Sequence, residues 1–291
     1  MEPVIGIIGG SGLYQIAELA DAEWHEVATP FGAPSDALLH GRIDGTRTVF
    51  LPRHGRGHVQ TPSSVPYRAN VAAMKAAGVT HLVSVSAVGS FREEMAPGDF
   101  VIVDQFIDRT FAREKSFFGP GLVAHVSVAH PVCPALSAAC AKAARQAGAK
   151  VHEGAIYLVM EGPQFSTLAE SRLYRDWGCD VIGMTNMPEA KLAREAELHY
   201  ASVAMVTDYD SWHPKHGSVQ ITEIIETLHG NVARAAGLIA ALPGHLGASC
   251  DAGCETALDH AVMTTPEARD PVMVERLHGI AGRLLTGDAP S

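Results

Sequence analysis

The chain has 291 residues, of which 47% are hydrophobic, and this is ample for a large core in one or two domains. Its formal net charge of −10 argues against a nucleic-acid-binding surface, although a small local basic pocket for phosphate remains compatible with it. The five cysteines are scattered and odd in number, which is typical of a reduced protein and favours a cytoplasmic location.

The chain opens with a short apolar run, Val4–Ile8, that leads into Gly9-Gly10-Ser11-Gly12. Without a basic leader, this run predicts a first buried strand rather than a signal peptide. No apolar run approaches membrane-spanning length, so we expect no membrane partner. The glycine turn either lets the backbone approach an anion or is a simple structural turn; Gln15 replaces the third glycine of a dinucleotide fingerprint.

Apolar runs and helical spacing then alternate along the chain. The apolar runs predict strands at Thr48–Leu51, His81–Ala87, Phe100–Ile107, Ile156–Met160 and Tyr200–Thr207, with a short run at Asp180–Ile182. Helical spacing appears at Tyr67–Ala77, Pro134–Ala147, Thr167–Trp177, Glu189–Ala196 and Thr222–Leu242, and again from about Val272. The alternation indicates an α/β fold. Because no linker interrupts it, we expect one domain over residues 1–291, with a core at 3–242 and a distinct tail at 243–291.

The strand predicted at Tyr200–Thr207 ends in two acids, Asp208 and Asp210. Alternate residues of a strand share a face, so we expect both carboxylates to point the same way. One carboxyl held neutral could protonate a nitrogenous base, while its ionised neighbour accepts hydrogen bonds. The alternative is a hydrated turn capped by the two aspartates.

Other strand ends carry candidate anion ligands. Arg53 offers a planar fork suited to phosphate, and His54 can donate as well, unless the segment is only a solvated basic loop. Ser86 adds a small hydroxyl at the end of its strand. Thr185 precedes a helix and could cap it or bind an anion at its positive end. Met184 could lie against a sugar or a base, or simply in the core.

Cys250 and Cys254 stand close together in a glycine-rich stretch. We interpret them as ordinary thiols, with a local disulfide or a metal site as the alternative. No histidine follows at zinc-finger spacing, so no metal is expected.

Taken together, several ordered motifs resemble the methylthioadenosine phosphorylase branch of the trimeric purine nucleoside phosphorylases. They are Ile5-Gly-Ile-Ile-Gly-Gly-Ser-Gly-Leu13, Thr29-Pro-Phe-Gly-Ala-Pro-Ser35, Arg53-His-Gly-Arg-Gly-His58, Val103-Asp-Gln-Phe-Ile-Asp-Arg-Thr110, Glu161-Gly-Pro-Gln-Phe-Ser166, Met184-Thr185 and Ala204-Met-Val-Thr-Asp-Tyr-Asp210. The resemblance covers about residues 3 to 240. It implies a single domain whose mixed central β-sheet is partly barrel-like and flanked by helices.

The resemblance implies phosphorolysis of methylthioadenosine to adenine and methylthioribose 1-phosphate, with inorganic phosphate as co-substrate and no cofactor. It implies a homotrimer in which the tail lies near a neighbour's site. Asp208 would protonate N7 of the purine and Asp210 would accept from its 6-amino group, which favours adenine over hypoxanthine. Gly183 departs from the asparagine of the mammalian enzymes.

The remaining site residues are also carried over from the resemblance. Those that would hold phosphate are Ser11, Arg53, His54, Ser86, Ala87 through its backbone, and Thr185. Those that would contact the nucleoside are Met184, Phe165, Ser166, Ile182, Thr207, His58 and His125, the last of these reaching a neighbour's site, together with Ile221, Ile224 and Ile225 around the 5′-methylthio group.

Three rival functions remain open from the sequence. The nearest is a broader phosphorylase that takes adenosine, inosine or methylthioinosine. A nucleosidase of related fold would use water in place of phosphate, and a nucleoside sensor would keep the pocket without catalysis. A nicotinamide dehydrogenase is disfavoured by the missing third glycine.

Overall fold

A computed structural model describes residues 2–10, 13, 16–214, 221–247 and 250–285, without the side chains of residues 221–226 and 228–229. In this part of the chain nine strands form one sheet, in the order β2-β3-β4-β1-β5-β8-β7-β6-β9. The strands are β1 (Ile5–Gly9), β2 (Ala20–His25), β3 (Leu38–Ile43), β4 (Thr46–Pro52), β5 (His81–Ser90), β6 (Phe100–Asp108), β7 (Val151–Val159), β8 (Val181–Gly183) and β9 (His199–Asp208).

Half of this sheet closes on itself. Strand β5 pairs with β8 on one side and with β9 on the other, so β5-β8-β7-β6-β9 forms a small barrel. Its pairings are mixed, because β5–β9 is parallel whereas β6–β9 is antiparallel. The predicted α/β fold with a mixed, partly barrel-like sheet is therefore confirmed.

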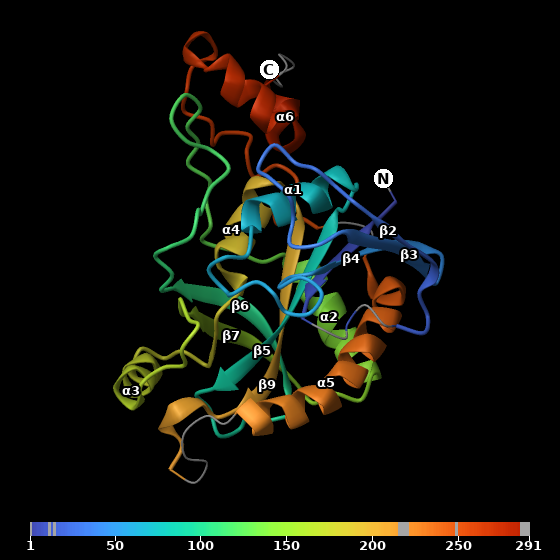
Figure 1. The fold of residues 1–291 in the computed structure, drawn as a ribbon, viewed down its shortest axis with the longest axis vertical. Helices are drawn as coiled ribbons and strands as arrows, with labels where there is room; N and C mark the ends of the chain where they lie inside the picture. The colour runs from blue at the N-terminus through green and yellow to red at the C-terminus, as the bar shows by residue number, and fades with distance from the viewer. Residues whose placement is uncertain (1, 11–12, 14–15, 215–220, 248–249, 286–291) are drawn as a thin grey trace.

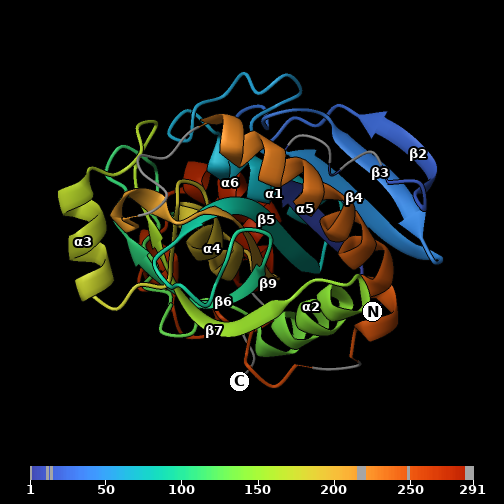
Figure 2. The same cartoon turned by 90° about the horizontal axis from the view of Figure 1, so that it is seen from below.

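Helices cover the sheet on both sides (Figures 1 and 2). On one side α2 packs against α5 and β9, and on the other α1 packs against α4 and α6. The helices are α1 (Tyr67–Ala76), α2 (Pro134–Gln146), α3 (Leu168–Asp176), α4 (Asn186–Glu195), α5 (Ile221–Ala241) and α6 (Pro271–Leu285), with short 3₁₀ turns at Asp210–Trp212, Leu242–His245 and Pro266–Ala268. Among the described residues, no helix has both the length and the apolar character needed to span a membrane.

Strand β1 illustrates why the buried strands read as continuous apolar runs. Ile8 faces the core shared with α1 and α4, whereas Ile5 and Ile7 face the core shared with α2 and α5. Since successive side chains point to opposite faces, a strand covered on both sides needs apolar residues at every position.

The structure adds two strands that the sequence did not predict, β2 and β3. Strand β2 is exposed throughout and pairs antiparallel with β3 at the edge of the sheet. An edge strand in water needs no apolar alternation, so its sequence carried no strand signal.

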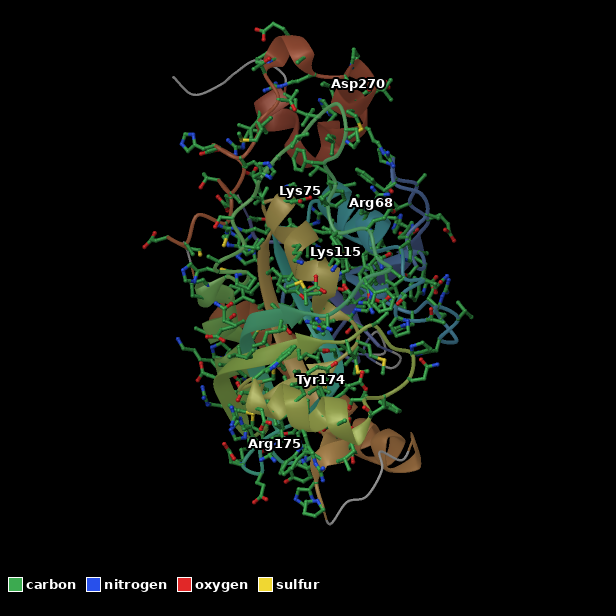
Figure 3. The ribbon with its side chains drawn as sticks, turned by 90° about the vertical axis from the view of Figure 1, so that its left-hand side faces the viewer. Arg68, Lys75, Lys115, Tyr174, Arg175 and Asp270 are labelled. Atoms are coloured by element: carbon green, nitrogen blue, oxygen red, sulfur yellow. The ribbon has the colours of Figure 1, made fainter. Side chains whose placement is uncertain are left out.

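The tail forms the predicted terminal helix, α6, whose Leu277 and Ile280 are buried in the core that contains α1. In a side view, Asp270 before α6 and Arg175 in α3 lie toward opposite ends of the molecule (Figure 3).

Candidate active site

A cavity of about 320 Å³ lies where the carboxyl ends of β4, β5, β8 and β9 meet. This volume is in the usual range for a small-molecule site. The site residues predicted from the sequence that line it are Arg53, His54, His58, Ser86, Ala87, Phe165, Ile182, Met184, Thr185, Thr207, Asp208 and Asp210. Side chains far apart in the sequence are thus gathered at one edge of the barrel.

Two other predicted residues lie outside the lining. Ser166 is buried behind the cavity and donates to Asp210. His125 is exposed, and its backbone N–H donates to the carbonyl of Ala261 at 2.8 Å. Its predicted contact with a neighbour's site therefore stays a prediction. Ser11 lies outside the described residues, as do the side chains of Ile221, Ile224 and Ile225.

The prediction that Asp208 and Asp210 share one strand face is wrong. Strand β9 ends at Asp208, and Asp210 opens a 3₁₀ turn with a φ of +49°. This left-handed conformation is one that aspartate tolerates better than most residues. The turn brings the backbone N–H of Asp210 to Oδ1 of Asp208 at 2.8 Å, so the two acids meet through a local bend.

The two carboxylates are held by separate hydroxyl groups. Oδ2 of Asp208 accepts from Thr207 at 2.8 Å, while both oxygens of Asp210 lie within 2.8 Å of the Ser166 hydroxyl. A Cβ on Gly89 would lie 2.9 Å from the Asp208 carboxylate, so a glycine leaves the space that this carboxylate occupies. The acids are therefore fixed in orientation before any ligand binds.

Arg53 does not present its planar fork to the cavity as predicted. The side chain is 2% exposed and pairs with Glu189, whose Oε2 lies 3.0 Å from Nε. Its other hydrogen bonds go to the carbonyls of Ile8 and Val85 and to the hydroxyl of Ser84. Of the five N–H donors of a guanidinium, one on Nη1 has no acceptor among the described residues. Arg53 thus offers the cavity its charge and one donor rather than a fork.

Glu189 is a residue that the sequence analysis missed. Burial alone would lower the pKa of Arg53, but the charge and hydrogen bond of Glu189 raise it, so the guanidinium stays charged. Oε1 of Glu189 also accepts from the hydroxyl of Tyr200 at 3.0 Å. A buried cation needs a carboxylate partner, and that requirement was the available signal.

Tyr157 is a second missed residue. Its hydroxyl is buried beside those of Ser86 and Thr185, but among the described residues neither it nor the Ser86 hydroxyl makes a hydrogen bond of good geometry. A Cβ on Gly183 would clash with the Tyr157 oxygen, so a glycine at 183 leaves the space that this hydroxyl occupies. Because an unpaired buried hydroxyl costs about 1–3 kcal/mol, both hydroxyls suit a ligand rich in oxygen.

Thr185 does not cap the following helix. Its hydroxyl makes no cap hydrogen bond and instead lies 3.3 Å from Oδ1 of Asn186. Met187 then has extended dihedral angles, so the regular part of α4 begins at Pro188. The Thr185 hydroxyl, which lines the cavity, therefore remains a candidate donor to a ligand.

His54 enters the site as a neutral side chain. Burial and then the charge of Arg53 lower its pKa to about 4. Nδ1 lies 2.9 Å from the Gln60 carbonyl, which can only accept, so the proton is on Nδ1 and Nε2 is an acceptor. The prediction that His54 donates to an anion is therefore wrong. Its Nε2 can instead accept a hydrogen bond from a protonated oxygen.

We expect the His54→Asn variant to lose less stability in mild acid than the wild type. Below pH 6.5 the unfolded wild type takes up a proton on His54, whereas the folded wild type does not. Between pH 7 and pH 5, His54 therefore lowers the free energy of unfolding of the wild type by about 1–2 kcal/mol. The side-chain amide of asparagine can still donate to the Gln60 carbonyl and does not titrate. Urea unfolding at both pH values measures the difference, and identical pH slopes for the two proteins would contradict a neutral buried His54.

The model of the phosphorylase superfamily matches residues 4–242 of the chain. The S-methyl-5′-thioadenosine phosphorylase of Cereibacter sphaeroides is 67% identical over 99% of this chain and 100% of its own length. That of Rhodospirillum rubrum is 55% identical, with 98% of each covered.

Two solved structures show the same fold. A methylthioadenosine phosphorylase from an Antarctic soil metagenomic library has a TM-score of 0.90 and 45% identity, over 96% of this chain and 99% of that one. A variant of adenosine/methylthioadenosine phosphorylase from Schistosoma mansoni, in complex with adenine, has a TM-score of 0.81 and 37% identity, over 85% and 93%. The chain therefore belongs to the phosphorylase superfamily.

Proposed function

We propose that this protein is a pentosyltransferase that cleaves S-methyl-5′-thioadenosine with inorganic phosphate. The products are adenine and 5-methylthioribose 1-phosphate, and the reaction serves methionine and purine salvage. The names of full-length relatives at 67% and 55% identity support this activity. The observation that carries it is one cavity in which Asp208 and Asp210 lie together with Arg53, Ser86 and Thr185.

The acid pair supplies the base side of the reaction. Cleavage of the glycosidic bond leaves a cationic sugar and places negative charge on the departing purine. A proton given by Asp208 to N7 removes that charge, and such general acid catalysis accelerates a reaction by about 10²–10⁴-fold. Asp210, held by Ser166, accepts from the 6-amino group.

Phosphate occupies the opposite side of the sugar in this proposal. The hydroxyls of Ser86 and Tyr157 are buried and unpaired in the described structure and can donate to its oxygens. Arg53 contributes its charge and its remaining Nη1 donor, and neutral His54 accepts from a phosphate or sugar hydroxyl. These fixed groups position phosphate beneath C1′, where it captures the cation. No cofactor takes part in this chemistry.

Adenosine is a second candidate substrate. The Schistosoma mansoni relative is described as acting on both adenosine and methylthioadenosine. Adenosine presents the same 6-aminopurine to Asp208 and Asp210 and differs only at the 5′ position.

The assembly that fits this function is a homotrimer in the cytoplasm. His125 is exposed and lies outside the cavity of its own chain, which supports a place beside a neighbour's site. None of the five cysteines forms a disulfide, which supports a reducing compartment.

Omitting phosphate tests the reaction class. With methylthioadenosine and phosphate we expect equal amounts of adenine and sugar phosphate, measured by chromatography and ³¹P NMR. Without phosphate, adenine release should stop. Adenine release that continues unchanged in phosphate-free buffer would instead identify a hydrolase, and binding without release would identify a sensor.

A further inference from the structure

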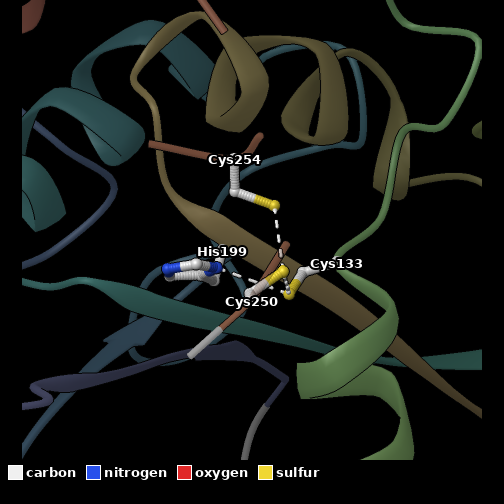
Figure 4. Close-up of side chains that lie close together, drawn as sticks. All are labelled: Cys133, His199, Cys250 and Cys254. Atoms are coloured by element: carbon white, nitrogen blue, oxygen red, sulfur yellow. Dashed lines mark hydrogen bonds between the residues drawn. The ribbon is translucent and has the colours of Figure 1, made fainter. Parts of the chain in front are cut away.

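Four side chains capable of binding a metal converge at the far end of β9 from the acid pair. Cys133 precedes α2, His199 begins β9, and Cys250 and Cys254 belong to the tail (Figure 4). Their ligand atoms all lie within 4.8 Å of one another. Cys250 is partly exposed and the other three side chains are buried. None of these four described residues lines the cavity, so they form a second, separate cluster.

The distances match a tetrahedral metal rather than a disulfide. Zinc bonds of about 2.3 Å to sulfur and 2.0 Å to nitrogen place two sulfurs about 3.8 Å apart and sulfur about 3.5 Å from nitrogen. Sγ of Cys133 lies 3.3 Å from Sγ of Cys250 and 3.4 Å from Nδ1 of His199, and the Cys250 and Cys254 sulfurs are 4.0 Å apart. A disulfide would require about 2.05 Å.

Surrounding groups orient the ligands as around known metal sites. Nε2 of His199 lies 3.0 Å from a carboxylate oxygen of Glu255, which leaves Nδ1 directed at the sulfurs. Metal-binding histidines commonly use their second nitrogen in this way. His81 stacks on the His199 ring at 4.5 Å, and the N–H of Leu136 donates to Sγ of Cys133.

We propose that Cys133, His199, Cys250 and Cys254 bind one zinc ion in a closed, structural site. Three thiolates and a neutral imidazole fill all four positions of a tetrahedral zinc, so no position is left for a substrate. Because the ligands are three thiolates and a neutral imidazole, binding releases whatever protons these four groups carry in the metal-free protein and gives the centre a net charge of −1.

This site would fasten the tail to the sheet. Cys250 and Cys254 anchor the segment that leads to α6, and His199 is the first residue of the strand that ends in Asp208. The three-residue gap between the two tail cysteines fits zinc ligands. No local spacing in the sequence reports this cluster, because Cys133 and His199 are 66 positions apart and Cys250 lies 117 positions after Cys133.

The test measures zinc in the untagged, full-length protein purified without chelator. We expect one zinc per chain by mass spectrometry, lost in Cys254→Ser and retained in Cys179→Ala, which removes a buried thiol outside the cluster. We also expect chelation of the wild type to lower its Tm. Full zinc content in Cys254→Ser would overturn the site.

A cobalt measurement on the wild type keeps the test decisive if the serine variant does not fold. Reconstitution of the reduced, metal-free protein with Co²⁺ should give thiolate-to-cobalt charge transfer and the visible bands of a tetrahedral ion. Wild type that contains no zinc and gives no such spectrum would refute the proposal. A native disulfide among these cysteines, seen as a mass lower by two hydrogen atoms, would refute it too.

Discussion

The Asp208→Asn variant is expected to lose about 10²–10⁴-fold in kcat/KM for methylthioadenosine. Asparagine keeps the shape of the site, because its oxygen can accept from the N–H of Asp210 and its amide can donate to Thr207. The Thr207 hydroxyl can then donate to the carbonyl of Val88, which lies 3.1 Å away. The substitution removes the proton that Asp208 would give to N7 of the purine, so we expect the decrease in kcat/KM to come from kcat.

The same variant should shift its preference toward inosine-type substrates, since an amide can donate to a 6-oxo group as well as accept. Asp104→Asn is a matched control, because Asp104 is exposed on β6 and outside the cavity lining. It should leave the kinetics unchanged. Equal rates of the wild type and Asp208→Asn on methylthioadenosine would remove Asp208 from its role as the acid.

The second large effect concerns stability rather than rate. Glu189→Gln should lower the free energy of unfolding by about 3–5 kcal/mol, because it leaves the buried guanidinium of Arg53 without a counter-charge. Both side chains are almost fully buried, at 2% and 1% exposure. Guanidinium chloride unfolding measures the change.

A surface ion pair provides the comparison. Arg145 and Glu153 are about half exposed and 2.6 Å apart, so Glu153→Gln should cost less than about 1 kcal/mol. If both substitutions had the same small cost, the Arg53–Glu189 pair would not be the buried structural support that we describe.

Local patterns in the sequence were sufficient for much of the fold. Strands such as β1 and β9 are buried along nearly their whole length and rich in apolar residues, because helices cover the sheet on both faces. Thr167 and Glu170 form the capping box that starts α3, a signal confined to one turn. Strand β2 escaped prediction because it is exposed and pairs with β3 at the edge of the sheet.

Twelve of the cavity-lining residues were predictable from the sequence, but their bonding was not. Strand ends identified which side chains line the cavity, because the carboxyl ends of parallel strands meet at one edge. The pairing of Arg53 with Glu189 spans 136 positions, and no local pattern reports it. The left-handed turn at Asp210 likewise depends on the bend after β9, which alternation along a strand cannot anticipate.

The central claim is that the cavity reads a 6-aminopurine nucleoside and transfers its sugar to phosphate. Its most direct test is kcat/KM for methylthioadenosine, adenosine, methylthioinosine and inosine, measured side by side with saturating phosphate. We expect each amino substrate to exceed its oxo counterpart by at least about tenfold, since an oxo group leaves the Asp210 carboxylate without its donor. Oxo substrates that react as fast as the amino substrates would contradict the account.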